Sequence, residues 1–238
     1  MNIANQRWMA ACGFISMIIL LIGLWVIAGF VPPPSPNNTM EQTVAIYAQK
    51  QDRIRVGLII SLYGATLLMP WAVVISEQMR RIEGPSAPLS RLQLALGVML
   101  VMEFLVATIF WLGAAFRPLQ FPEITWRLHD LGGIMYVGLP VTTMLEATAL
   151  GIVILMDKRE KPVFPRWLAY LSFWAAASFT FGSLNYLTHT GPLAYNGLLA
   201  WWLGLTAFTL WIAAVSFCLL RNAIPNQILE EQAANVSQ

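Results

Sequence analysis

The sequence predicts an all-helical protein that crosses a membrane several times, and composition and charge distribution are the observations behind this prediction. Of the 238 residues, 58% are hydrophobic and 11% are charged, and the mean hydropathy is +0.63. Soluble domains average about 25% charged residues. The charges here are clustered and leave apolar stretches of about 20 residues, the length that crosses the hydrocarbon core of a bilayer. We therefore expect a polytopic membrane helix bundle.

Six apolar stretches have the length of transmembrane helices. The first is longer than the 7–15-residue apolar region of a signal peptide, so we expect a retained helix. A single transmembrane domain should then cover residues 1–222, and residues 223–238 should form a polar cytoplasmic tail with a frayed end. The expected spans are 9–31, 54–76, 91–114, 129–155, 165–188 and 195–220.

The basic residues predict the orientation, because cytoplasmic loops carry an excess of Lys and Arg. With the N-terminus inside, nine basic residues lie on the cytoplasmic side and five on the outer side. Both termini are therefore expected in the cytoplasm. The inner set is Arg7, Arg80, Arg81, Arg91, Lys158, Arg159, Lys161, Arg166 and Arg221, and the outer set is Lys50, Arg53, Arg55, Arg117 and Arg127.

The first outer loop should contain a short helix over residues 39–52. Thr39 and Gln42 have the spacing of a capping box, and Met40, Val44 and Tyr47 give the helix one apolar face. We expect this helix to lie on the outer membrane surface. A simple spacer between two spans is the alternative.

Small residues and prolines indicate how the spans pack. Gly57, Ser61 and Ala65 recur every four residues on the second span and permit close approach of another helix. Pro70 and Pro140 interrupt the second and fourth spans, and each leaves a backbone carbonyl that must be satisfied within the bundle. Such a kink also makes room for a site.

Two glutamates inside apolar spans are the candidate catalytic residues. Glu103 lies in the third span and Glu146 in the fourth. A carboxyl in the membrane is costly and is a functional-site hypothesis by default. These two helices are antiparallel, so the carboxyls could meet or flank one cavity. Three roles stay open: a structural hydrogen bond, a proton-linked or polar-ligand cavity, or acid–base catalysis on a lipophilic substrate.

Polar and aromatic residues of the later spans are candidates for ligand binding. His129, Tyr136 and Thr143 fall on one side of the fourth helix and form a polar stripe from the outer end toward the middle. Tryptophans of the last two spans could wall an apolar pocket, although packing explains them equally well. The candidate ligand-binding residues are Tyr136, Thr142, Thr143, His129, Asn185 and Trp201.

The sequence predicts neither a metal nor another cofactor. His129 and His189 are too few for a closed metal site, so we expect hydrogen bonding at the membrane interface in place of metal or haem ligation. Cys12 and Cys218 lack a ligand-type spacing and indicate small buried apolar residues. Nucleotide-binding and hydrolase motifs are missing, and the net charge of +2 does not suggest nucleic acid.

Three segments resemble a group of uncharacterised bacterial multi-pass membrane proteins. They are Phe30-Val31-Pro32-Pro33-Pro34-Ser35-Pro36, Gln78-Met79-Arg80-Arg81-Ile82-Glu83-Gly84, and the run from Gly191 to Trp202, GPLAYNGLLAWW. The resemblance covers nearly the whole chain and implies a six-helix protein of the bacterial cytoplasmic membrane. It implies no activity.

The leading hypothesis is a membrane protein that binds or transports a small lipophilic or weakly polar molecule, with proton linkage through Glu103 and Glu146. The second is a cofactor-free isomerase or cyclase that uses the two glutamates as acid and base. The third is a non-catalytic subunit of a membrane complex. The expected partners are the lipid bilayer, a small lipophilic ligand, and a second copy or another membrane protein.

Overall fold

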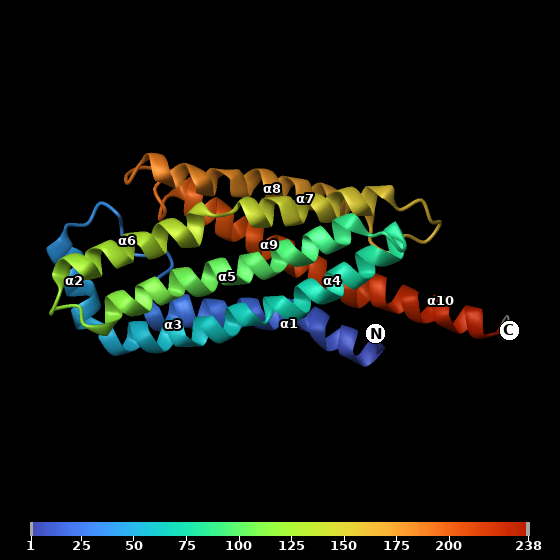
Figure 1. Cartoon of the computed structure of the whole chain (residues 1–238), viewed down its shortest axis with the longest axis horizontal. Coiled ribbons are helices and arrows are strands. Elements are labelled where there is room, and N and C mark those ends of the chain that lie inside the picture. The colour runs from blue at the N-terminus through green and yellow to red at the C-terminus, as the bar shows by residue number, and fades with distance from the viewer. Residues whose placement is uncertain (1, 237–238) are drawn as a thin grey trace.

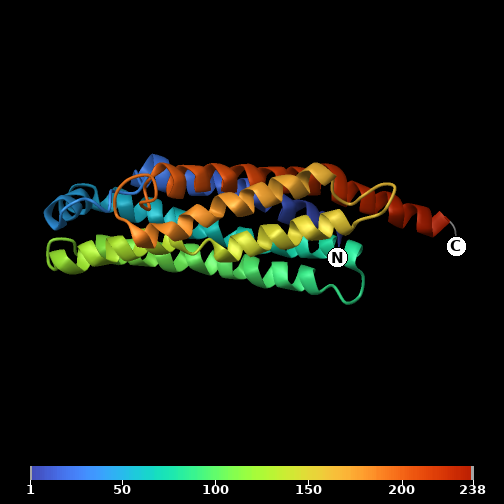
Figure 2. The same ribbon diagram turned by 90° about the horizontal axis from the view of Figure 1, so that it is seen from above.

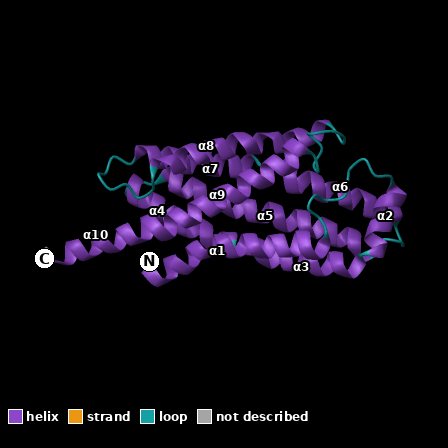
Figure 3. Ribbon diagram, turned by 180° about the vertical axis from the view of Figure 1, so that it is seen from behind, coloured by secondary structure: helices purple, strands orange, loops and turns teal. Residues whose placement is uncertain are grey.

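The computed structural model describes residues 2–236, and every regular element in that range is a helix. The helices run along the long axis of one elongated bundle (Figures 1 and 2). Loops gather mainly at the two ends of the bundle (Figure 3). In chain order the elements are α1 (Ile3–Leu21), η1 (Ile22–Ala28), α2 (Met40–Gln49), α3 (Gln51–Thr66), α4 (Leu68–Glu83), α5 (Pro88–Phe116), α6 (Pro122–Gly138), α7 (Val141–Met156), α8 (Arg166–Phe179), η2 (Thr180–Leu187), η3 (Leu198–Leu203), α9 (Gly204–Cys218), η4 (Leu219–Ala223) and α10 (Ile224–Val236).

Within the described residues, five helical stretches are long and apolar enough to cross a membrane, which indicates a multi-pass membrane protein. They are Ile3–Ala28, Gln51–Glu83, Pro88–Phe116, Pro122–Met156 and Leu198–Ala233. The expected fifth span, 165–188, is not among them. Its α-helix α8 has 14 residues, or about 21 Å, and the chain then continues as the 3₁₀-helix η2.

Both expected proline interruptions occur, and proline stereochemistry explains the first directly. A proline ring clashes with the carbonyl four residues before it. For Pro70 that residue is Thr66, where α3 ends. The second break separates α6 from α7 at Leu139 and Pro140. The fourth stretch is therefore two helices with an irregular joint between them.

The small residues of α3 pack on the first helix as the sequence predicts. An added Cβ at Gly57 would lie 2.4 Å from the carbonyl oxygen of Gly23, and one at Gly23 would lie 2.4 Å from Ser61 Oγ. The two backbones are therefore in contact, and α3 packs along both α1 and η1. Any larger side chain at either glycine would force the helices apart.

Helix α2 begins with the predicted capping box at one end of the bundle (Figure 1). The Thr39 hydroxyl accepts from the Gln42 amide at 3.3 Å, and the Gln42 side chain accepts from the Thr39 amide at 2.9 Å. Val44 and Tyr47 on its apolar face are buried, and α2 packs on α6. This face therefore covers the end of the bundle.

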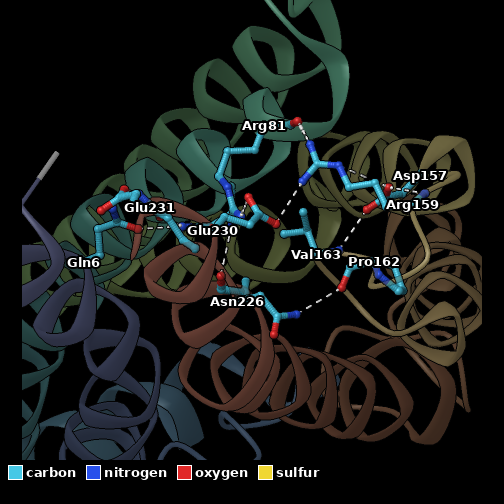
Figure 4. A network of polar contacts seen from close by, with 12 residues as sticks. Gln6, Arg81, Asp157, Arg159, Pro162, Val163, Asn226, Glu230 and Glu231 are labelled. Carbon is cyan, nitrogen blue, oxygen red and sulfur yellow. Dashed lines mark hydrogen bonds and ion pairs between the residues drawn. The ribbon is translucent and has the colours of Figure 1, made fainter. Parts of the chain in front are cut away.

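The expected frayed tail is wrong for residues 224–236, which form helix α10; residues 237 and 238 lie outside the described range. A polar network joins α10 to the loops at its end of the bundle (Figure 4). The Arg81 guanidinium reaches Glu230 at 2.8 Å and also donates to the Ala223 carbonyl. Arg159 pairs with the same carboxylate at 3.6 Å. These charge pairs hold the polar segment in a helix that the sequence pattern does not reveal.

Candidate functional site

A cavity of about 110 Å³ lies at the break between α6 and α7. One water molecule needs about 10–15 Å³ on this measure, so the cavity has room for several waters or part of an organic molecule. Its walls come from α1, η1, α5, α6, α7, η2, η3 and α9. Helix α8 contributes its last residue, Phe179. Of the longer helices, α3, α4 and α10 contribute no residue to the lining.

The cavity lies at the helix break, where η2 approaches the backbone of α6 closely. Tyr136 and Val137 precede the break, Thr143 follows it, and all three line the cavity. An added Cβ at Gly182 would lie 2.4 Å from the Val137 carbonyl oxygen. Glycine at position 182 thus lets η2 approach the disrupted turn closely.

Aromatic rings form one side of the site. The Tyr136 ring stacks between Trp111 and Trp201. Its centroid lies 5.1 Å from that of Trp111 and 5.9 Å from that of Trp201. Phe104 lies 4.7 Å from the Tyr136 ring. Tyr136 also packs against both core clusters of the bundle, one at each end. The cavity therefore lies where the two cores meet, beside the rings of Tyr136 and Phe104.

Glu103 supplies the carboxyl of this cavity. It lies on α5 and is 8% exposed. Thr142, in the first turn of α7, donates to Glu103 Oε1 at 2.7 Å. The break at Pro140 positions Thr142 for this contact, because α7 begins at Val141. One carboxyl oxygen therefore accepts a hydrogen bond from α7.

Trp201 supplies an unused hydrogen-bond donor. The residue lines the cavity and is 4% exposed. Its indole Nε1 is buried and has no hydrogen-bond partner among the described residues. A buried N–H without an acceptor is costly, and native proteins rarely leave one. The described part of the chain provides no acceptor for this group.

Glu146 does not line this cavity, which corrects the expectation that the two glutamates flank one site. Its carboxyl is fully buried and accepts from Gln93 Nε2 at 2.8 Å. An added Cβ at Gly97 would lie 3.0 Å from Glu146 Oε1, so the carboxyl rests against the α5 backbone one to two turns from Glu103. The two carboxyls have separate hydrogen-bond partners, Thr142 for Glu103 and Gln93 for Glu146.

His129 also lies away from the cavity and is fully buried. Its Nε2 lies 3.1 Å from the Pro34 carbonyl, which can only accept, so this nitrogen carries a proton. Nδ1 of the neutral ring then accepts from the Tyr47 hydroxyl at 3.0 Å. Burial raises the pKa of the Tyr47 phenol well above its usual value, so this donor keeps its proton.

A second tyrosine completes this histidine cluster. The Tyr195 hydroxyl lies 3.1 Å from His129 Nε2 and donates to Asp130 Oδ1 at 3.3 Å. The cluster therefore joins α6 to α2, to the loop after η1 and to the loop before η3. It fastens three connections at one end of the bundle, and its ring nitrogens are occupied.

The remaining candidates divide between the cavity and its support. Tyr136, Thr143 and Trp201 line the cavity, whereas Thr142 acts through Glu103. Asn185 is buried behind the break, where its Nδ2 donates to the Ile134 carbonyl at 3.4 Å and its Oδ1 has no partner among the described residues. It stands beside Gly138, whose added Cβ would lie 2.9 Å from that oxygen.

Sequence reasoning missed the contribution of the first helix and of Gly204. Met17, Leu20 and Leu24 line the cavity, but an apolar residue in an apolar span carries no distinguishing signal. Gly204 also lines it. In the sequence this glycine resembles any small residue at a helix contact, so its role could not be recognised.

The cavity wall is apolar apart from a few groups that can form hydrogen bonds. Cys12 and Cys218 are buried and free. Within the described residues, no three His, Cys, Asp or Glu side chains lie close enough together to hold a metal ion.

No protein-family model matches the chain, and neither the curated proteins nor the solved structures contain a significant match.

Proposed function

We propose that this chain is a six-span protein of the bacterial cytoplasmic membrane with both termini inside. Together α8 and η2 number 22 residues, and at about 1.5 Å and 2.0 Å per residue they extend about 37 Å. That length exceeds the about 30 Å of a hydrocarbon core. The start of α1 and the end of α10 lie at the same end of the bundle (Figure 1), as an even number of membrane crossings requires. The excess of basic residues supports a cytoplasmic location for that end.

Its proposed function is to bind or transport a small lipophilic molecule that has one weakly polar group. The observation that carries this proposal is the cavity at the α6–α7 break, where Trp201 offers a buried N–H without a partner. An apolar cavity with a few convergent polar groups is the usual form of a small-molecule site. The aromatic wall of Tyr136 and Phe104 favours a hydrocarbon or flat ligand.

The polar group of the ligand follows from the two groups that remain available. The Trp201 indole can only donate, so the ligand must present an oxygen or another acceptor. Glu103 has one oxygen occupied by Thr142, and its second oxygen can receive a hydrogen bond from the ligand. A hydroxyl group satisfies both demands, because it accepts and donates at once.

Ligand binding ranks above acid–base catalysis because only one of the two glutamates borders the cavity. The isomerase hypothesis requires a second proton-handling group at the site. Glu146 is engaged by Gln93 on another part of α5. A proton-linked step would therefore depend on Glu103 alone.

The experiment uses purified full-length protein in phosphatidylcholine nanodiscs and hexadecanol that carries a photoactivatable diazirine near its hydroxyl. We expect cross-linking near Trp201 that saturates and is displaced by excess hexadecanol. Trp201→Phe should weaken binding about two- to tenfold, the effect of one lost hydrogen bond of about 0.5–1.5 kcal/mol. Trp202→Phe is the matched control, because the Trp202 side chain is 38% exposed and does not line the cavity. Unsaturable labelling of the wild type would refute ligand binding.

A further inference from the structure

Gly204 is unlike the packing glycines of this bundle. At Gly23 and Gly57 an added Cβ would lie 2.4 Å from atoms of the neighbouring helix. At Gly204 an added Cβ would meet no atom within 4 Å. Its backbone is right-handed helical, with φ −58° and ψ −50°, so the conformation does not require glycine either.

Glycine destabilises a helix relative to alanine, and at this position no close contact offsets that cost. Gly204 borders the cavity. The missing side chain therefore leaves free space beside the ligand site, where even a small residue would begin to fill it. Open space for a ligand is what glycine supplies at this position.

This space lies between α1 and α9 and reaches the outside of the bundle. Leu21 on one helix and Leu205 and Thr209 on the other line the cavity and are partly exposed. The two helices contact each other, but η1, which continues α1, packs on α3. In our proposal, the open space at Gly204 is a lateral opening of the cavity between α1 and α9.

The outer surface around the opening is hydrocarbon. Ile18 and Trp25 on the first helical stretch are 58% and 57% exposed, and Leu210 on α9 is 51% exposed. All three belong to stretches with the length and composition of membrane spans. A molecule that passes this opening therefore comes from the bilayer, with its apolar part in acyl chains.

Charge further restricts the ligand. Among the described residues that line the cavity, Glu103 is the one ionisable acid and none is basic. A phosphate or carboxylate head group would find no cation there and would face the carboxyl of Glu103. Burial of an unpaired anion is strongly unfavourable. A neutral head group that can accept a hydrogen bond, such as a hydroxyl, avoids this cost.

We propose that the cavity takes a single-chain lipid with a hydroxyl head group from the bilayer through the opening at Gly204. The head group lies between Glu103 and Trp201, and the chain extends through the opening. This inference rests on the proposed function and adds the class of ligand and its route of entry.

The route is tested in nanodiscs that contain the diazirine hexadecanol in the bilayer. Gly204→Leu fills the opening and should reduce the saturable cross-linking at least tenfold. Leu210→Trp is the control and should retain it, because Leu210 is 51% exposed and is not among the residues that line the cavity. Leu21→Trp narrows the opening from the other rim and should reduce cross-linking if Gly204→Leu does not fold. Undiminished labelling in a folded Gly204→Leu or Leu21→Trp protein would overturn lateral entry, while saturable binding would still stand.

The ligand class is tested by competition with unlabelled lipids in the wild-type protein. Hexadecanol should displace the probe, and palmitate should require a concentration at least tenfold higher. Displacement by palmitate at the same concentration as hexadecanol would overturn the head-group assignment. If the wild type shows no saturable cross-linking at all, the binding function itself fails, and this result differs from either of the other two.

Discussion

Gln93 and Glu146 form a buried side-chain pair between α5 and α7. Gln93 Nε2 donates to Glu146 Oε1 at 2.8 Å, and both side chains are fully buried. Gln93 Oε1 and Glu146 Oε2 have no hydrogen-bond partner among the described residues. A neutral carboxylic acid at Glu146 would donate from Oε2 to Gln93 Oε1, and one proton would satisfy both atoms. The pair therefore has the composition of a two-bond acid–amide ring.

The first prediction concerns this pair. Glu146→Gln should fold with nearly wild-type stability, because an amide can reproduce both bonds of the ring with Gln93. Glu146→Ala should lower the free energy of unfolding by about 1–3 kcal/mol, since it leaves the buried Gln93 amide without a partner. Unfolding in mixed detergent measures both variants. A large loss in Glu146→Gln would show that the ionised carboxylate is required.

The second prediction concerns proton linkage at Glu103. Glu103→Gln keeps an oxygen for the Thr142 hydroxyl but cannot exchange a proton. If the carboxyl couples protons to the ligand, the pH dependence of cross-linking across about pH 5 to 8 should vanish in this variant. Glu146→Gln is the control and should keep the wild-type profile. An unchanged profile in Glu103→Gln would assign Glu103 a purely structural role.

The third prediction concerns the histidine cluster under α2. Tyr47→Phe removes the donor to His129 and should destabilise this end of the bundle by about 1–2 kcal/mol. Hydrogen exchange should accelerate over α2 and the preceding loop while α7 and α8 stay unchanged. Tyr63→Phe is the matched control, because the Tyr63 side chain is 71% exposed. Equal exchange in both variants would mean that the cluster does not hold α2.

The fourth prediction concerns α10. Arg81→Ala should release this helix and increase its hydrogen exchange, because Arg81 bonds to Gln78, Ala223 and Glu230. Arg80→Ala should have little effect, since the Arg80 side chain pairs with Glu77 on the exposed surface. Exposed ion pairs are worth about 0–1 kcal/mol. Full protection of α10 in Arg81→Ala would assign its stability to apolar packing instead.

The fifth prediction concerns orientation in the membrane. In a background without Cys12 and Cys218, cysteine at Ser86 or Glu160 should be protected from an impermeant thiol reagent in intact cells. Cysteine at Asn38 or Pro118 should react. The positive-inside bias is the physical reason. The reverse pattern would overturn the proposed topology, and labelling at both ends would indicate mixed insertion.

Much of the fold could be predicted because the apolar composition of a stretch of sequence indicates a membrane span. The apolar stretches predict the five long helical segments, the capping box at Thr39 predicts the start of α2, and Pro70 predicts the end of α3. The fifth expected span was harder, since its second half is a 3₁₀-helix that hydropathy does not distinguish from an α-helix. Helix α10 was missed because the contacts that order it come from distant residues: Ile224 and Ile228 pack in the core, and Glu230 pairs with Arg81 and Arg159.

The sequence by itself determined the membrane class, the extent of most helices, and the presence of two costly carboxyls in apolar surroundings. These properties depend on residues close together in the chain. Only the tertiary structure decided which carboxyl borders the cavity, because that depends on how far each helix is turned and shifted against its neighbours. Glu103 meets Thr142 at the cavity, and Glu146 meets Gln93 away from it. The empty space at Gly204 likewise exists only between two helices that are distant in sequence, so no local pattern could reveal it.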